Sequence, residues 1–525
     1  MPARPLSMSE KTPYKRWEGE TIKLIGRNSR LSLLQIDIVK RKIQNEFPGL
    51  NVEVIARNSK GDALQNIPLH TVEGSDFFTQ DIFDTLTLGE ADIAVHSLKD
   101  MSSEHFFGAN EFAVVDRDDT RDVAIFNTDV EEKIKRGETL IVGTCSPRRE
   151  EMATVFLKKA LPQLNGEIKI ETKDIRGNVE TRLRKLNNGE YDATILATAG
   201  LNRLLSSKDD AELILRLLAD KKLTVLPLIE CVPAPCQGAI VAEAHHLNTK
   251  AVQILQKINE KQLFADCYAE KKEAVKYGAG CIQKFGVTTL RTKNDKYLYA
   301  AGKDSEGTEF VKWNSLPDIK IEGLLFSSTD LMKGFFDYEW SDKEVKIEKP
   351  VAFIANYKTI QGQPEVQSLS NKTIIASGTK TWFELSKKGY WVTASADALG
   401  FEFLLSSLSR PLLNIKAEDI SILTNEAAAE RWQLKGYDAV SNYEQLPKND
   451  EKIRESIVTA EAIFWTSFSQ YEFYGKYAKP AAKHLCAGGE TAELLKKAGV
   501  EPVIFPTIKA FEQWRRSSIR SRSVA

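Results

Sequence analysis

The sequence predicts an α/β protein built from several domains, and three observations point to this. The chain has 525 residues, which is too long for a single hydrophobic core. From Thr21 onward, short apolar runs alternate with amphipathic segments, and the alternation starts again after Thr139. Finally, a pattern in the last third of the chain repeats at an offset of 110 residues, as between Gly389 and Gly499.

The region from Thr21 to about residue 200 is predicted to consist of alternating strands and helices. Strands are predicted at 21–26 and 51–56 around a helix at 31–47, and a further helix and strand follow within 76–98. After Thr139 the same order returns, with strands at 139–146, 168–175 and 191–200 and helices at 147–162 and 178–189. Because strands that alternate with helices form βαβ units, we expect two α/β domains, each with a mostly parallel sheet.

These two domains are expected to exchange chain segments. A crossover near 117–121 and a return near 227–238 would give one domain at 21–116 plus 232–257 and a second at 117–231. Ligands of open α/β sheets bind at the carboxyl ends of the strands. We therefore expect a cleft between the two domains that collects the polar residues following their strands.

Two further regions complete the chain. Residues 258–345 predict a small α+β domain, because a charged helical stretch is followed by β-rich runs with polar turns. Residues 350–525 predict a pair of α/β lobes, since each copy of the repeat reads as strand, glycine-rich turn, helix, glycine cap and strand. Residues 1–20 are expected to form a flexible tail.

Composition excludes several classes of protein. Lys+Arg 72 against Asp+Glu 73 gives a net charge of -1, so no overall field would attract nucleic acid or a membrane surface. The six cysteines include no CxxC pair, which argues against disulfides and a thiolate metal site. The N-terminal stretch lacks an apolar core, and no run approaches about 18 apolar residues. We therefore expect a cytoplasmic protein with no metal site.

The segment 143–150 places two arginines at the start of a predicted helix. Ser146 can cap this helix, Pro147 fits its first position, and Arg148 and Arg149 stand in its first turn. Two cations there are unfavourable unless an anion lies on them, because a helix start already carries partial positive charge. The alternatives are a carboxylate or phosphate site and a pair of solvated surface arginines.

Other arginines follow similar turns, at Arg27, Arg176, Arg182 and Arg203. Their convergence would favour a ligand with several carboxylates, since guanidinium groups pair well with carboxylates. A nucleotide is disfavoured, because the sequence has neither a Walker loop nor a GxGxxG motif.

Two residues in this region can carry chemistry. Asp100, which follows Lys99, can be a helix cap or the partner of that lysine, or it can stabilise a carbocation and transfer a proton within the cleft. Cys281, beside Gly280, can be a nucleophilic or covalently substituted thiol, or a buried inert cysteine.

Six segments in order resemble the porphobilinogen deaminase family, also called hydroxymethylbilane synthase. They are GRNSRLSLLQ, HSLKD, GTCSPRRE, IRGNVETRLRKLNNGEYDATILATAGLNRL, PAPCQGA and GAGCIQKFG, within about 21–302. The resemblance implies two domains similar to periplasmic binding proteins. It also implies a small third domain whose cysteine carries a dipyrromethane cofactor through a thioether.

The resemblance further implies roles for individual residues. Cys281 would carry the cofactor, and Asp100 would be the catalytic carboxylate. The residues that would bind acetate and propionate groups of cofactor and substrate are Arg27, Ser29, Lys99, Ser146, Arg148, Arg149, Arg176, Arg182 and Arg203, with Gln237 lining the interdomain strands. The implied reaction is a stepwise condensation of four porphobilinogen molecules, with loss of ammonia, into hydroxymethylbilane; no protein partner is implied.

The chain departs from the family pattern at several positions. Residues 75–78 read Ser-Asp-Phe-Phe where the family has a Lys-Gly-Leu-Phe lid loop. Glu180 and Cys236 each replace a glycine, Pro147 replaces a leucine, and Lys284 replaces a proline. Glu180 adds an anion near the arginines, and we expect it to be tolerated on a helix face.

The C-terminal repeat resembles uroporphyrinogen-III synthase, through segments such as IFWTSFSQYEF and CAGGETAELLKKAGVEPVIF. That family's first strand and helix are expected to be missing before Pro350. The resemblance implies cyclisation of the bilane to uroporphyrinogen III, with Tyr443 and Thr466 as positions to test. Two alternatives stay open: C-terminal lobes that only dock or channel the bilane, and a chain that binds a polycarboxylate or tetrapyrrole without turnover.

Overall fold

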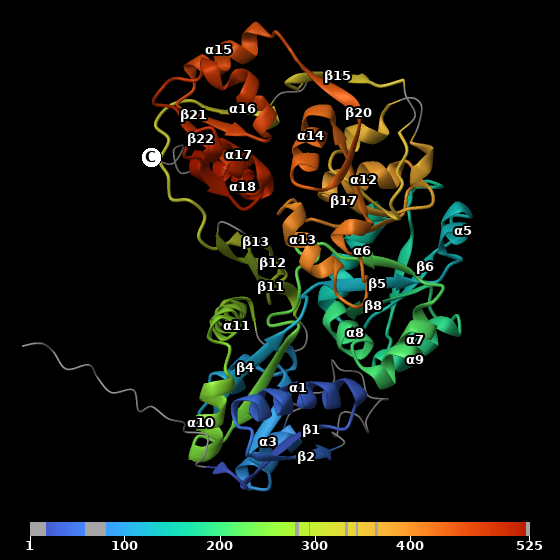
Figure 1. Cartoon of the computed structure of the whole chain (residues 1–525), viewed down its shortest axis with the longest axis vertical. Coiled ribbons are helices and arrows are strands. Elements are labelled where there is room, and N and C mark those ends of the chain that lie inside the picture. The colour runs from blue at the N-terminus through green and yellow to red at the C-terminus, as the bar shows by residue number, and fades with distance from the viewer. Residues whose placement is uncertain are drawn as a thin grey trace, which may run out of the picture.

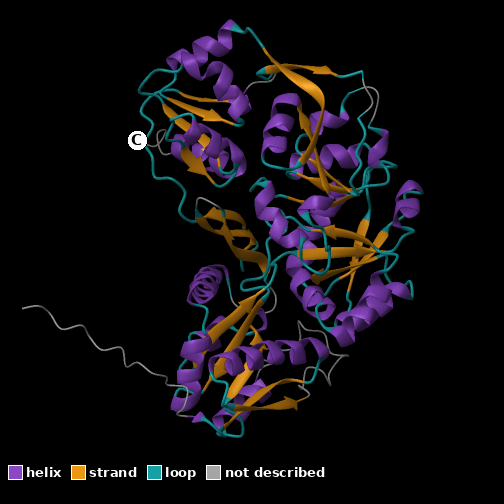
Figure 2. Cartoon of the chain, in the orientation of Figure 1, coloured by secondary structure: helices purple, strands orange, loops and turns teal. Residues whose placement is uncertain are grey.

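The computed structural model describes residues 17–57, 80–278, 283–292, 295–330, 334–342, 345–362 and 366–520. Within these residues the chain forms five sheets with helices packed against them (Figure 2). The N-terminal sheet, in blue, lies at the opposite end of the molecule from the C-terminal lobes, in orange and red (Figure 1). The prediction of an α/β protein with several sheets is confirmed.

The first sheet has the order β2-β1-β3-β10-β4. Its strands are β1 (Thr21–Arg27), β2 (Asn51–Arg57), β3 (Ile93–Ser97), β4 (Glu111–Arg117) and β10 (Ala239–Ala244). The helices of this part are α1 (Arg30–Glu46), α3 (Gln80–Thr87), the short η3 (Leu98–Asp100), α4 (Ser103–Phe106), α10 (Thr249–Ile258) and α11 (Lys261–Ala274). α1 buries Ile36, Val39 and Ile43 against the sheet, as its spacing of apolar residues predicts.

The second sheet has the order β7-β6-β8-β5-β9. Its strands are β5 (Asp122–Phe126), β6 (Leu140–Gly143), β7 (Ile170–Lys173), β8 (Ala193–Ala197) and β9 (Lys222–Val225). Its helices are α5 (Val130–Lys135), α6 (Pro147–Ala160), α7 (Val179–Asn187), α8 (Thr198–Leu205) and α9 (Lys208–Leu218). α6 begins as the sequence predicts, with Ser146 as its cap and Pro147 in its first turn.

Both sheets are mixed, which corrects the expectation of mostly parallel sheets. β10 runs antiparallel to β3 and β4, and β5 runs antiparallel to β8 and β9. Each of these strands follows a segment that crosses between the two sheets, so it enters its sheet from the opposite direction. The direction of a strand therefore depends on where the crossovers enter each sheet. The local alternation of apolar residues contains no information about this.

The third sheet is the small antiparallel sheet β11-β12-β13. It consists of β11 (Lys284–Arg291), β12 (Lys296–Lys303) and β13 (Glu309–Trp313), with α11 and the short η4 (Val275–Tyr277) preceding it. Figure 1 shows it between the first sheet and the C-terminal lobes. Its position lets it contact both halves of the molecule.

The C-terminal residues form two mainly parallel sheets. The six-stranded sheet contains β15 (Phe336–Trp340), β16 (Val351–Ile354), β17 (Thr373–Ala376), β18 (Val392–Ser395), β19 (Ile420–Asn425) and β20 (Asp438–Pro447). Its helices are η6 (Tyr357–Ile360), η7 (Gln367–Leu369), α12 (Thr379–Lys387), α13 (Phe401–Leu408), η8 (Ala417–Asp419) and α14 (Glu426–Leu434).

The four-stranded sheet has the order β14-β21-β22-β23. Its strands are β14 (Leu325–Ser327), β21 (Ala462–Trp465), β22 (Lys483–Ala487) and β23 (Val503–Phe505). Its helices are η5 (Ser328–Asp330), α15 (Glu451–Thr459), α16 (Phe468–Tyr474), η9 (Gly475–Tyr477), α17 (Glu490–Lys497) and α18 (Ile508–Arg520).

The 110-residue repeat corresponds to β17 and α12 in one sheet and β22 and α17 in the other. Leu385 and Leu495 are both fully buried, and Gly389 and Gly499 both adopt left-handed backbone, with φ of +84° and +81°. Glycine suits this conformation because it carries no Cβ.

Strand pairing places the start of the C-terminal lobes earlier than the predicted boundary at 345/350. β14 pairs with β21 in parallel, and β15 pairs with β20 in antiparallel fashion. Residues predicted to belong to the small third domain therefore complete both C-terminal sheets. Two strands, β14 and β15, thus precede Pro350, and β14 is too short to be recognised from its own three residues. Whether either is the family strand expected to be missing there stays a prediction.

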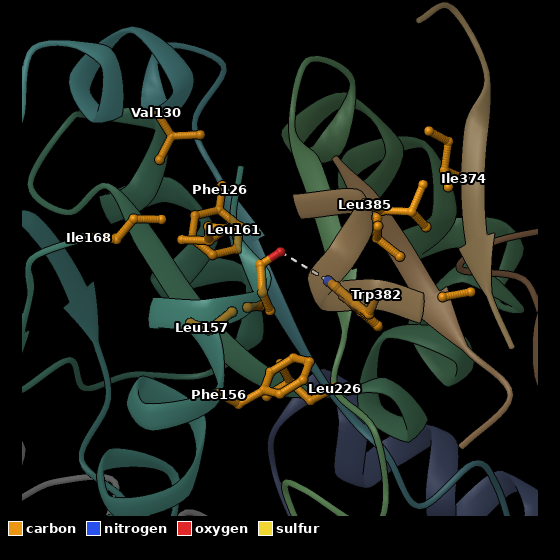
Figure 3. Close-up of a cluster of buried hydrophobic side chains, with 14 of the residues drawn as sticks. Phe126, Val130, Phe156, Leu157, Leu161, Ile168, Leu226, Ile374, Trp382 and Leu385 are labelled. Carbon is orange, nitrogen blue, oxygen red and sulfur yellow. Dashed lines mark hydrogen bonds between the residues drawn. The ribbon is translucent and has the colours of Figure 1, made fainter. Parts of the chain in front are cut away.

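One hydrophobic cluster joins the second sheet to the six-stranded C-terminal sheet, and it includes Phe156 of α6 and Trp382 of α12 (Figure 3). The two rings meet edge to face, with centroids 5.1 Å apart. Trp382 is fully buried, and its Nε1 donates to the carbonyl oxygen of Ala160 at 2.9 Å. The C-terminal region is thus part of a shared core.

Trp382→Ala should lower the free energy of unfolding by about 3 to 5 kcal/mol, because it removes a large buried ring from this shared core. Trp382→Phe keeps a ring but loses the N–H donor, and should cost about 1 kcal/mol. Urea unfolding of the full chain measures both. Leu434→Ala, at a side chain that is 89% exposed, is the control and should change little. Equal stability of Trp382→Ala and this control would contradict the shared core.

Candidate functional site

The two crossovers between the first and second sheets meet at Asp122, a carboxylate with no exposed surface at the start of β5. It accepts from Arg149 Nη2 and Arg148 Nη2, both at 2.7 Å. Gln237 Nε2, on the returning segment, donates to the same carboxylate at 2.9 Å. One buried anion therefore ties the start of α6 to both crossovers.

A cavity of about 640 Å³ lies between the first and second sheets. The predicted site residues that line it are Arg27, Ser29, Lys99, Asp100, Arg149, Arg176, Arg182 and Arg203. Arg27 ends β1, and the others follow β1, β3, β6, β7 and β8, whose ends open toward this space. The structure thus brings together most of the residues that the sequence predicts for one site.

Two arginines of this cavity, Arg176 and Arg182, form no ion pair with a carboxylate among the described residues, whereas Arg203 pairs with Asp116 at 2.9 Å. Burial and the like charges of Arg149 and Arg176 lower the pKa of Arg182. Arg176 Nη2 is buried without a hydrogen-bond partner among the described residues. Such a cluster is suited to an anionic ligand with several carboxylates.

Among the acidic residues that line the cavity, Glu180 and Asp210 form ion pairs with Arg30, at 3.5 and 2.7 Å. Among the described residues, Asp100 forms no ion pair within 4 Å. Asp100 ends the short η3 turn and is exposed toward the cavity. Burial lowers the pKa of the neighbouring Lys99, although the charge of Asp100 opposes this.

Three predicted residues do not line the cavity. Arg148 uses both terminal nitrogens within the protein, one for Asp122 and one for the carbonyl of Val232 at 2.7 Å. Gln237 is bound to Asp122 and to the carbonyl of Thr120, and Ser146 serves as the cap of α6. Their positions indicate that they hold the crossovers and the start of α6.

Two predicted features lie outside the described residues: Cys281, the expected attachment site, and the altered loop at 75–78. Cys281 follows η4 and precedes β11 in the chain. Their contributions stay predictions.

Two of the positions that depart from the family pattern, Glu180 and Cys236, fit their surroundings. Glu180 accepts from Arg184 at 2.9 and 3.0 Å, so its charge is largely directed to its own helix. Cys236 adopts left-handed backbone with φ of 62°, which explains why glycine is usual there. Its N–H donates to Glu270 at 2.7 Å, which offsets part of the strain.

Sequence reasoning missed two residues that organise the site. Asp122 carried one available signal, since it is a charged residue at the head of an otherwise apolar strand. Glu270 carried none, because it lies in a helical stretch rich in other charges. Glu270 is fully buried and receives both terminal nitrogens of Arg117 at 2.9 Å, which joins α11 to the end of β4.

A second cavity, of about 810 Å³, lies between the two C-terminal lobes. Loops after β16, β19 and β21 line it, and Arg291 of the third sheet also reaches it. Thr466 lines this cavity and is hydrogen-bonded to Ser328 at 3.0 Å. Tyr443 is buried and does not line it.

Among the described helices, none is long and apolar enough to cross a membrane. In the same residues no group of three or more His, Cys, Asp or Glu side chains is placed to hold a metal ion.

Comparisons with known proteins point to one family. A family model described as "Porphobilinogen deaminase, dipyromethane cofactor binding domain" matches residues 22–253. Two curated relatives named "Probable porphobilinogen deaminase", from Saccharolobus islandicus strains L.S.2.15 and M.14.25, are each 32% identical over 290 residues. The match covers 55% of this chain and 88% of each relative.

Solved structures give only distant likenesses. The regulatory domain of OxyR2 from Vibrio vulnificus has a TM-score of 0.26 and 15% identity, over 46% of this chain and 95% of that chain. The BenM effector-binding domain with benzoate has a TM-score of 0.26 and 13% identity, over 47% of this chain and 93% of that chain.

Asp122→Asn should lower the free energy of unfolding by about 3 to 5 kcal/mol at neutral pH, because two buried arginines lose their counter-charge. Although burial opposes it, Arg149 and Arg148 hold the pKa of Asp122 well below its ordinary value of 3.8. A lowered folded pKa contributes stability that is complete above 3.8 and is lost as the pH falls below it.

The difference between Asp122→Asn and the unsubstituted chain should therefore be constant above about pH 5 and shrink below about pH 4. Urea unfolding at several pH values measures this. Asp37→Asn, which removes an exposed ion pair with Arg41, is the matched control and should change stability by less than about 1 kcal/mol. A difference that grows toward acid would refute the assignment.

Proposed function

Because this chain belongs to the porphobilinogen deaminase family, we propose that it condenses four porphobilinogen molecules, with loss of ammonia, into hydroxymethylbilane. Residues 22–253 contain the dipyrromethane cofactor-binding domain of that family. The observation that carries the proposal is the cavity between the first two sheets, where several arginines lie near Asp100. Among the described residues Asp100 forms no ion pair, whereas the other two carboxylates of the cavity pair with Arg30. This arrangement suits a substrate that bears acetate and propionate groups and reacts through a cation.

The cavity fits a dipyrromethane with several carboxylates. Among the described residues, Arg176 and Arg182 form no ion pair with a carboxylate, and Arg149 is held beside them by Asp122. Cys281 is the residue that would carry the group, by the family resemblance. When bound, the dipyrromethane supplies the end on which condensation begins.

The chain's own residues would then act in two ways. The carboxylate of Asp100 would stabilise the cation that remains when ammonia leaves the substrate, and would take up the proton released when two rings are joined. The arginines would neutralise the carboxylates that accumulate as the product grows, and orient them by paired hydrogen bonds. Arg148 and Gln237 would act indirectly, by holding Asp122 and the crossovers.

A binding protein without turnover is the competing reading. Both functions need the arginines, but only the enzyme needs Asp100 beside them and an attached primer.

An alternative for the C-terminal lobes is a docking module that holds the bilane without closing it.

For the C-terminal lobes, we propose cyclisation of hydroxymethylbilane to uroporphyrinogen III as a second activity. The cavity of about 810 Å³ between the lobes supports this proposal, because it is lined by the loops that follow parallel strands. Its hydroxyl and amide groups, such as Thr466 and Asn425, could hold the acidic side chains of a bilane.

Asp100→Asn should keep the attached dipyrromethane and lower kcat by about 100-fold or more, because it removes the proton-transferring carboxylate. Cys281→Ser should carry no added pyrrole mass and show no turnover. Intact-protein mass spectrometry and a porphobilinogen assay measure the two effects. Cys486→Ser, at a cysteine in the four-stranded sheet, is the control and should keep the adduct. An unmodified Cys281 after expression with substrate present would support the binding protein instead.

The unsubstituted chain should convert porphobilinogen mainly into the type III isomer of uroporphyrinogen, since unassisted closure of the bilane gives type I. Thr466→Val removes a cavity hydroxyl and should shift the product toward type I without slowing porphobilinogen consumption. Thr459→Val, on the exposed face of α15, should leave the isomer ratio unchanged. If the unsubstituted chain yields type I alone, cyclisation fails and the docking module is favoured.

A further inference from the structure

A buried carboxylate lies behind the turn that carries Asp100. Glu243 of β10 has no exposed surface. Its Oε1 accepts from His105 Nε2 and from Asn110 Nδ2, both at 2.7 Å, and His96 Nε2 lies 3.2 Å from its Oε2. Although burial opposes it, His105 and His96 lower the pKa of Glu243 to about 2. An ionised carboxylate accepts only, so the imidazole N–H of His105 points at it.

The two histidines stand on opposite sides of η3 in the chain. His96 lies in β3, just before Leu98–Asp100, and His105 lies in α4, just after it. The backbone N–H of His105 donates to the hydroxyl of Ser102, the cap of α4, at 3.0 Å. The carboxylate of Glu243 is therefore hydrogen-bonded to the chain after the turn that presents Lys99 and Asp100, and it lies 3.2 Å from the imidazole before that turn.

The same turn is held from another part of the molecule. Lys271 of α11 is buried, and its ammonium group donates to the carbonyl oxygen of Met101. The aromatic rings of Phe83 and Phe112 meet the imidazole of His105 edge on, with centroids 5.0 and 6.0 Å away. The imidazole is thus confined by packing as well as by hydrogen bonds.

Glu243 and His105 do not line the arginine-rich cavity. His96 and Asp100 together line a smaller cavity of about 100 Å³ beside it. Glu243 is therefore placed to act on Asp100 through the backbone and not on a ligand.

We infer that Glu243, through His96 and His105, is a positioning residue that sets the orientation of the Lys99–Asp100 turn for the condensation reaction. The inference rests on the proposed function for its catalytic consequence, but the ordering of the turn can be measured without it. A buried charge restrains its partners strongly, because leaving it unpaired costs far more than a neutral contact. A carboxylate that is displaced by about 1 Å loses rate more than it loses substrate affinity.

Glu243→Gln in the full chain, bearing its attached cofactor, tests this. The variant keeps the side-chain shape and removes the charge. We expect kcat, per molecule carrying the adduct, to fall by about tenfold with KM changed by less than about twofold. Amide hydrogen exchange in a peptide covering 97–106 should become about tenfold faster. Glu111→Gln, at an exposed carboxylate on the neighbouring β4, is the control and should alter neither quantity.

His105→Gln is the second variant, in case Glu243→Gln does not fold. It removes one hydrogen bond from Glu243 and should give the same pattern with a smaller change. The variant that combines Glu243→Gln and His105→Gln should have a kcat no lower than that of the slower single variant, because the two residues act as one unit.

Unchanged amide exchange in 97–106 would overturn the inference, because Glu243 would then not order the turn. A raised KM at constant kcat would also overturn it, because this would indicate a role in substrate binding. If the unsubstituted chain forms no bilane while exchange still rises in the variants, the proposed function fails and the positioning of the turn stands.

Discussion

The pairing of Asp122 with Arg148 and Arg149 is the interaction on which the arrangement of the site depends. A carboxylate without exposed surface is stable only when its charge is compensated, so the start of α6 and both crossovers must meet at this point. Gln237 adds the returning segment to the same carboxylate. The first two sheets are thereby held around one cavity, and Arg149 is held at its wall. Glu270 does the same for the third sheet, since it binds Arg117, the N–H of Cys236 and the N–H of Thr289.

The C-terminal lobes are joined to this arrangement by buried contacts. Arg121, on the crossover, pairs with Asp397 at 3.2 Å and donates to Ser407 of α13 at 2.6 Å. Burial raises the pKa of Asp397 to about 6, although Arg121 opposes the shift. The shared core around Trp382 adds apolar contact with α6, the helix that carries Arg148 and Arg149. The two proposed activities therefore lie in a continuous structure, in which α13 lines the C-terminal cavity and also touches a crossover.

Much of the local structure could be predicted, because it depends on neighbours in the chain. The cap at Ser146, the amphipathic α1 and the glycine caps at Gly389 and Gly499 follow from short-range sterics and hydrogen bonding. The direction of β5 and β10 could not, because it is set by where the crossovers enter each sheet. β14 and β15 were predicted to belong to the small third domain. Their true sheets could not be predicted, because such short strands are defined by pairing with strands more than 100 residues away.

The sequence by itself determined the chemistry of the protein: arginines at successive strand ends, one aspartate after a lysine, and ordered motifs that resemble a single family. These are properties of residue type and spacing, and they can be read before the fold is known. Only the tertiary structure decided which arginines line the cavity and which lie away from it. Arg148 and Arg149 are neighbours in one helical turn, yet only Arg149 lines the cavity. The physical reason is that Asp122, a carboxylate brought from another strand, binds both guanidinium groups inside the protein, and the carbonyls of Val232 and Ile195 fix where each one lies.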